Sequence, residues 1–137
     1  MEPLIVDSNV IVASFLDTEA RHDIARQYIN GLENGDYVFH LPMLVPVEAI
    51  SAIWRHTQGQ GMALVTRARM SLEDWEAAGG LILYPLNRER MELGMDAAIK
   101  YRLSGADSIV SSLADELDMP FVTFDSTLQR RVPRASP

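Results

Sequence analysis

The sequence contains no cysteine and only one lysine, Lys100. Without cysteine the chain has no disulfides and no thiolate metal sites, a composition that fits a cytoplasmic protein. No apolar run approaches the roughly 20 residues that cross a bilayer, so we expect no contact with membranes. The opening residues, Met1-Glu2-Pro3, are not basic and therefore do not resemble a signal peptide.

Positive charge is scarce as well. The net charge of −7 argues against broad, sequence-independent binding of nucleic acids, which usually needs a basic face. It does not argue against a nuclease, because a cation-binding cluster of acids itself adds negative charge. The 137 residues, 47% of them hydrophobic, are typical of one globular domain. We predict a single domain over residues 1–137, with a C-terminal tail from about residue 130.

Short apolar runs alternate with segments of helical periodicity along the chain. The predicted strands cover residues 4–6, 37–41, 81–86 and 121–124. The predicted helices cover residues 8–16, 18–32, about 46–57, 62–78, 88–102 and 104–117, and a short helix follows residue 126. This alternation predicts an α/β fold with a parallel β-sheet of four to five strands, right-handed crossovers and helices on both faces.

The helices are expected to have defined ends and apolar faces. Ser8 and Asn9 are suitable N-caps for the first helix, and the helix over 62–78 is expected to be interrupted near Ser71. The predicted apolar faces are Val47, Ile50, Ile53 and Trp54 in the third helix, and Met91, Met95, Ala98 and Ile99 in the fifth.

Four acidic residues stand where strands end or helices begin. Asp7 and Asp125 close apolar strands, whereas Glu48 and Asp107 lie just inside helices. A parallel sheet brings strand ends and the following helix starts to one edge, where open sheets bind ligands. Four carboxylates there would repel one another unless a hard cation, Mg²⁺ or Mn²⁺, neutralised them. Cations held in this way cleave phosphodiesters in many enzymes.

Each acid also has a purely structural interpretation. Asp7 and Asp125 could cap the helices that follow them, and Asp107 could form a capping box with Ser104. Glu48 could be a first-turn residue favoured by the helix dipole. The convergence of all four on one predicted sheet edge favours a shared site.

A phosphoryl-transfer domain is one alternative, because such domains are also α/β with acids at strand ends. A haloacid phosphatase needs a second Asp two residues after the first, where this chain has Asn9. A receiver domain needs a lysine after a late strand, whereas Lys100 lies in a predicted helix. The three histidines lack zinc-like spacing, and no phosphate-binding glycine loop is present.

The segments around the four acids resemble the motifs of the PIN-domain family, and within it the VapC-type toxins of prokaryotic toxin–antitoxin pairs. The matching segments are Leu4-Ile5-Val6-Asp7-Ser8-Asn9-Val10-Ile11, Val47-Glu48-Ala49-Ile50, Gly105-Ala106-Asp107-Ser108-Ile109-Val110 and Val122-Thr123-Phe124-Asp125. Their order and spacing match over nearly the whole chain. The resemblance implies a PIN-like sheet and a Mg²⁺- or Mn²⁺-dependent endoribonuclease.

The resemblance also implies roles for particular residues. The implied metal-binding and catalytic acids are Asp7, Glu48, Asp107 and Asp125, supported by the polar groups of Asn9 and Thr123. Many members carry another acid just after the last aspartate, where this chain has Ser126 and Thr127. The resemblance therefore does not decide whether the site binds one metal ion or two. The implied partners are an RNA substrate, a cognate antitoxin and a second copy of the chain. The alternative within the family is an RNA-processing protein outside toxin systems, or a catalytically silent module that binds RNA or protein.

Overall fold

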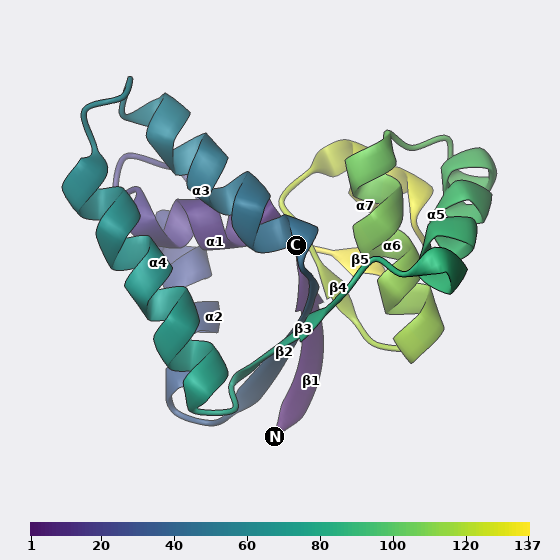
Figure 1. Cartoon of the computed structure of the whole chain (residues 1–137), viewed down its shortest axis with the longest axis horizontal. Coiled ribbons are helices and arrows are strands. Elements are labelled where there is room, and N and C mark those ends of the chain that lie inside the picture. The colour runs from purple at the N-terminus through teal and green to yellow at the C-terminus, as the bar shows by residue number, and fades with distance from the viewer.

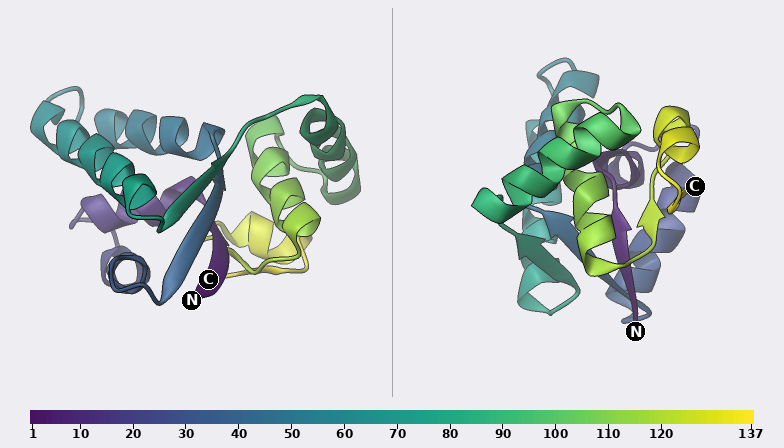
Figure 2. Two further views of the ribbon diagram at one scale, coloured as in Figure 1. Left: turned by 60° about the horizontal axis from the view of Figure 1, so that its bottom comes forward. Right: turned by 90° about the vertical axis from the view of Figure 1, so that its right-hand side faces the viewer.

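The computed structural model describes all residues, 1–137. It contains five strands and seven helices. The strands are β1 (Glu2–Val6), β2 (Tyr37–Pro42), β3 (Leu81–Tyr84), β4 (Phe121–Val122) and β5 (Ala135–Ser136). The helices are α1 (Ser8–Phe15), α2 (His22–Glu33), α3 (Leu44–His56), α4 (Met62–Ala77), α5 (Arg88–Tyr101), α6 (Gly105–Leu117) and α7 (Ser126–Arg131). Helices α1 to α4 lie on one side of the sheet and α5 to α7 on the other (Figures 1 and 2). The predicted α/β fold with helices on both faces is confirmed.

All strands of the sheet run parallel, in the order β3-β2-β1-β4-β5. The chain winds outward from β1 through β2 to β3 and then returns to β4 on the other side of β1. In such sheets the crevice at this reversal, outside the carboxyl ends of the two strands, is the usual ligand site. Val6 pairs with Val122, so the residues that follow β1 and β4 emerge side by side.

Thirty buried apolar residues form one core around this sheet. Ile5 and Val6 of β1 and Phe121 of β4 are almost fully buried, which fixes the two central strands between the helical layers. None of the helices is long and apolar enough to cross a membrane.

The segment predicted as a C-terminal tail contributes a strand. Strand β5 pairs with β4, and the Thr123 N–H donates to the Ser136 carbonyl at 2.9 Å. Arg134 Nε donates to Asp115 Oδ1 at 2.8 Å, which attaches this segment to α6. A strand of two residues has no periodic pattern, so hydrophobic periodicity could not predict it.

Several predicted helix ends are wrong. The N-cap of α1 is Asp7, as the structural interpretation of that acid predicted, and not Ser8 or Asn9. Helix α2 begins at His22 instead of residue 18, because residues 17–21 form turns. Helix α4 is continuous through Ser71. Strand β4 ends at Val122, because the following backbone N–H groups bond partly to side chains, as described below.

The predicted apolar face of α5 is largely wrong, and that of α3 is confirmed only at Ile53 and, in part, at Ile50. Helix α3 buries Val45, Ala49 and Ile53, at a spacing of four residues, and leaves Val47 65% exposed. Helix α5 buries Gly94, Ala97 and Tyr101 and exposes its predicted apolar residues Met91, Met95 and Ile99. A Cβ at Gly94 would lie only 3.7 Å from the Ile109 side chain, so the small residues Gly94 and Ala97 allow α5 to approach α6 closely and are buried there.

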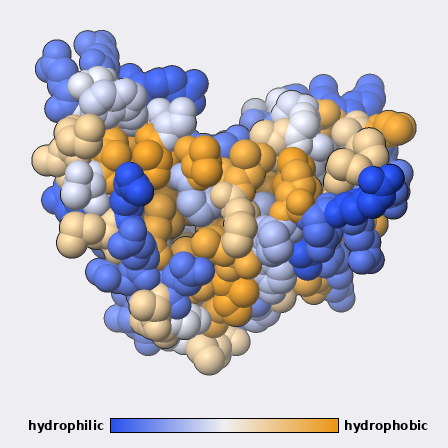
Figure 3. All heavy atoms as spheres, viewed as in Figure 1, coloured by the Kyte–Doolittle hydropathy of each residue, from blue (hydrophilic) through white to orange (hydrophobic).

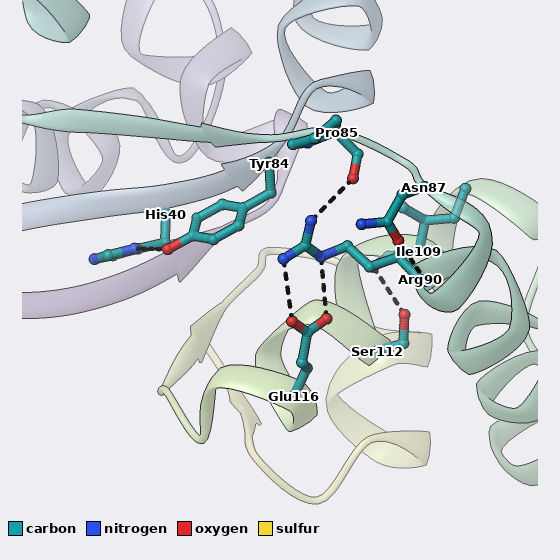
Figure 4. Close-up of polar contacts among 8 residues, drawn as sticks. All are labelled: His40, Tyr84, Pro85, Asn87, Arg90, Ile109, Ser112 and Glu116. Atoms are coloured by element: carbon teal, nitrogen blue, oxygen red, sulfur yellow. Dashed lines mark hydrogen bonds and ion pairs between the residues drawn. The ribbon is translucent and has the colours of Figure 1, made fainter.

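A polar cluster around Arg90 fastens α5 to the sheet and to α6 (Figure 4). Arg90 pairs with both carboxylate oxygens of Glu116 at 3.2 Å and donates to the Pro85 carbonyl. Its guanidinium also lies 5.1 Å from the centre of the Tyr84 ring, and Tyr84 bonds to His40. Glu116, Pro85 and the Tyr84 ring together engage the Arg90 guanidinium. We therefore interpret the cluster as structural.

Candidate functional site

Asp7 is the most constrained of the predicted acids. It follows β1 and is only 5% exposed. Its Oδ1 accepts the Ser8 N–H at 2.8 Å, which makes it the N-cap of α1. Its Oδ2 accepts the Thr123 hydroxyl at 2.9 Å and, at 3.4 Å, the Asn9 side-chain amide. The structural and functional interpretations of Asp7 are therefore compatible, because capping occupies one oxygen and leaves the other directed toward β4.

Thr123 and Asn9 connect the ends of β1 and β4. The Thr123 Oγ1, which is buried, also accepts the Asn9 amide at 3.2 Å and the Asp125 N–H at 3.1 Å. The Asn9 Oδ1 accepts the Phe124 N–H at 3.1 Å. The two predicted supporting residues thus fix the turn that carries Asp125 next to Asp7.

Asp125 combines capping with an available oxygen. Its Oδ1 accepts the Thr127 N–H at 2.8 Å and the Leu128 N–H at 3.2 Å, at the start of α7. Both of these hydrogen bonds use the same oxygen, so the second oxygen of the half-buried carboxylate can face a ligand.

The two helical acids come from opposite sides of the sheet. Asp107 lies in the first turn of α6, where its N–H donates to the Ser104 N-cap at 3.4 Å. Glu48 lies in the second turn of α3, because that helix begins at Leu44 rather than near Pro46. The proposed dipole role of Glu48 in a first turn is therefore wrong.

The charges of the four acids act on one another. Burial raises the pKa of Asp7 above its usual value; hydrogen bonds from Thr123 and Ser8 oppose this, and the charges of Asp107 and Asp125 add to it. Burial also raises the pKa of Glu48, and the charges of Asp7 and Asp107 raise it further. The four acids thus share one electrostatic neighbourhood, and we call them, with Asn9 and Thr123, the acid cluster.

Asp107 follows the same pattern. Burial raises its pKa, a hydrogen bond with Ser104 opposes the rise, and the charge of Asp125 adds to it. None of the ion pairs in the molecule includes any of the four acids. The acid cluster therefore concentrates negative charge that no side chain of this chain neutralises.

The acid cluster has the donor chemistry of a site for a hard cation, since it offers several carboxylate oxygens. However, no three acidic or histidine side chains converge closely enough to hold an ion between them. In charge and in atom type, the four carboxylates nevertheless fit a divalent cation. Direct coordination by more than two acids would require side-chain rotation, and water could bridge the others, because Mg²⁺ usually retains several of its waters.

Two residues beside the acid cluster were not predicted from the sequence. The Arg21 guanidinium lies 5.3 Å from the centre of the Phe124 ring. Both residues line a pocket that also includes Ser8 and Asn9. Arg21 lies in a turn about a hundred residues before Phe124, and no spacing in the sequence indicates that they meet.

A family model for the PIN domain matches residues 4–134, so the chain belongs to the PIN-domain family. The match includes all four acids and the two polar residues between them. No curated protein sequence matches the chain significantly.

Solved structures with this fold include toxins and toxin–antitoxin complexes. VapC20 of Mycobacterium tuberculosis, described as a toxin that cleaves the sarcin-ricin loop, has a TM-score of 0.71 and 13% identity over 93% of each chain. A toxin–antitoxin complex from Klebsiella pneumoniae has a TM-score of 0.69 and 17% identity, covering 98% of this chain and 96% of that chain. FitAcB of Neisseria gonorrhoeae has a TM-score of 0.68 and 14% identity, covering 96% of this chain and 94% of that chain. At these identities the likeness establishes the fold.

Proposed function

We propose that this protein is a Mg²⁺- or Mn²⁺-dependent endoribonuclease and the toxin of a toxin–antitoxin pair. The observation that carries the proposal is the group of four carboxylates at the switch point of the sheet, whose charges repel one another and none of which forms an ion pair. Membership of the PIN-domain family and the likeness to VapC20, a toxin that cleaves the sarcin-ricin loop, support it.

In this proposal Asp7 and Asp107 bind the cation directly, while Glu48 and Asp125 complete the site directly or through water. A bound divalent cation supplies a water of lowered pKa and compensates the charge that develops on the phosphate. Thr123 and Asn9 hold the Asp7 carboxylate in one orientation, so that its lone pair is directed before the cation arrives. No side chain of the cluster is needed as the nucleophile.

The direct test incubates the purified protein with structured RNAs, including tRNA and ribosomal RNA, in Mn²⁺ or in EDTA. We expect cleavage at defined positions only in Mn²⁺. Asp107→Asn should reduce the cleavage rate by about a hundredfold or more, because the amide keeps the shape but loses the ligand charge.

Glu92→Gln serves as a control, because it removes one carboxylate from the exposed surface of α5. It should cleave at the wild-type rate. Cleavage by Asp107→Asn close to the wild-type rate would overturn the metal-site proposal, whatever the RNA target.

The proposed antitoxin would act on the acid cluster. An arginine of such a partner could pair with the carboxylates bidentately and exclude the cation, and the net charge of −7 favours docking of a basic segment. Expression of this chain alone should arrest growth, and co-expression of its antitoxin should restore it. If the chain is harmless in cells while the purified protein cuts RNA, the toxin assignment fails and the nuclease assignment survives.

A second copy of the chain is the other proposed partner. Apolar residues gather on the face between α3–α4 and α5 (Figure 3). A groove of about 610 Å³ between α3, α4 and β3 is lined mainly by apolar side chains, among them Val47, Trp54 and Met62. These three are 65%, 38% and 61% exposed in the single chain. Since a monomer seldom exposes so many large apolar groups together, we propose that a homodimer covers this face.

A further inference from the structure

A pocket of about 260 Å³ lies beside the acid cluster, between α1, the turns at residues 17–21 and the C-terminal half of α3. Asn9, which bonds to Asp7, and Phe124, which precedes Asp125, form the wall shared with the cluster. A ligand in the pocket would therefore be adjacent to a phosphate held at the acids.

The pocket has a small apolar interior and a polar rim. Its apolar lining consists of Val12, Ala13, Ala20, Ala52 and Phe124. The rim contains Glu19 and His56, whose Oε1 and Nε2 lie 3.2 Å apart, and Arg21. An apolar interior bounded by donors and acceptors suits a planar heterocycle, which has apolar faces and a polar edge.

Arg21 is the only arginine or lysine among the residues that line the pocket. Its guanidinium rests on the Phe124 ring, and its side chain forms no hydrogen bond or ion pair with the protein. By contrast, Arg90 and Arg134 are both paired with carboxylates. The Arg21 donors therefore remain available to a phosphate, which a guanidinium binds in a bidentate manner.

We propose that this pocket holds one nucleobase of the RNA substrate, next to the scissile phosphate, and that Arg21 binds the phosphate of the same nucleotide. The proposal rests on the nuclease function above and adds a source of substrate selection to it. It also explains how an RNA strand approaches four negative charges, because Arg21 places a positive charge at their border.

The test is a titration of the ¹⁵N-labelled protein, in Mg²⁺, with AMP, GMP, CMP, UMP and ribose 5-phosphate, followed by amide chemical shifts. At least one nucleotide should shift the amides of Ala20, Arg21, Ala52 and Phe124. It should bind about fivefold or more tightly than ribose 5-phosphate, as base stacking on an aromatic surface provides.

Two variants distinguish binding of the base from binding of the phosphate. Ala52→Phe fills the pocket and should make the nucleotides bind no better than ribose 5-phosphate, in a protein whose remaining amide spectrum is unchanged. Arg21→Ala should weaken the binding of nucleotides and of ribose 5-phosphate alike. Because Arg21 is exposed, the fold should be retained. Arg88→Ala, which removes a charge from an arginine 84% exposed on α5, is the matched control and should change nothing.

Nucleotides that leave the pocket amides unshifted, or that bind no better than ribose 5-phosphate, would overturn the proposal. If N-acetyltryptophan amide shifts those amides and the nucleotides do not, the pocket takes a side chain of a protein partner instead. The readout is binding, so it is independent of cleavage. RNA cleavage without nucleotide binding defeats only this inference, and binding without cleavage defeats only the nuclease.

Discussion

At the scale of single residues, the acid cluster depends on Thr123. Its hydroxyl donates to Asp7 and accepts from both Asn9 and the Asp125 N–H, so one buried oxygen serves three partners. Removal of that oxygen would leave Asp7 Oδ2 with only the longer hydrogen bond from Asn9, and the Asp125 N–H without its partner.

Thr123→Val keeps the shape of the side chain and removes the hydroxyl. We expect the rate of RNA cleavage to fall by about 10- to 100-fold, the usual effect of losing a group that orients a metal ligand. Thr123→Ser keeps the hydroxyl and should retain most of the activity. Equal rates for the valine and serine variants would show that the hydroxyl does not orient Asp7.

A substitution of Glu48 can measure how much the clustered charges destabilise the fold. Its pKa is raised in the folded protein, so its ionised form destabilises the fold at pH values above that pKa. In EDTA, Glu48→Gln should raise the melting temperature at pH 7, and this gain should disappear as the pH falls below about 4, where glutamate is protonated in both states.

Addition of Mn²⁺ at pH 7 should reduce or reverse this gain, because a bound cation stabilises only the form that offers the ligand. Thermal unfolding of both proteins at pH 4 and pH 7 measures the effect. A gain that is the same at both pH values would contradict the electrostatic explanation.

At the scale of elements, α6 carries an unusual number of buried serines. Ser108, Ser111 and Ser112 are all buried, and two of them donate to the carbonyl three residues earlier. The Ser111 Oγ has no partner and is fully buried. An unpaired buried hydroxyl costs free energy that an alanine would not.

Ser111→Ala should therefore raise the free energy of unfolding by about 1 kcal/mol, through the removed hydroxyl and the better helix propensity of alanine. Urea denaturation measures it. Ser108→Ala in the same helix loses a 2.7 Å hydrogen bond to the Gly105 carbonyl and should be less stabilised or destabilised. The explanation fails if the two variants shift the transition equally.

At the scale of the whole molecule, the homodimer that we propose covers the exposed apolar face between α3–α4 and α5. Light scattering should give the mass of a dimer at micromolar concentration, about twice 15.3 kDa. Val47→Glu places a charge on this face and should shift the mass toward the monomer.

Ile24→Glu is the control for the dimer, because Ile24 is 42% exposed on α2, away from that groove. It should leave the mass unchanged. A wild-type protein that is monomeric at these concentrations would contradict the homodimer.

The sequence by itself determined the alternation of strands and helices, and with it the parallel α/β sheet. It also determined where the four acids stand relative to that sheet, because strand ends and helix starts are encoded by local patterns. The positions of Asp7 and Asp125 after apolar strands were sufficient to predict that they share an edge.

Only the tertiary structure decided which surfaces are covered. Hydropathy predicted that Met91, Met95 and Ile99 face the core, whereas close packing of Gly94 and Ala97 on α6 turned those residues outward. The short strand β5 forms only because β4 offers it an edge. Likewise, the contact of Arg21 with Phe124 exists only in the folded chain, because it joins residues that no local pattern relates.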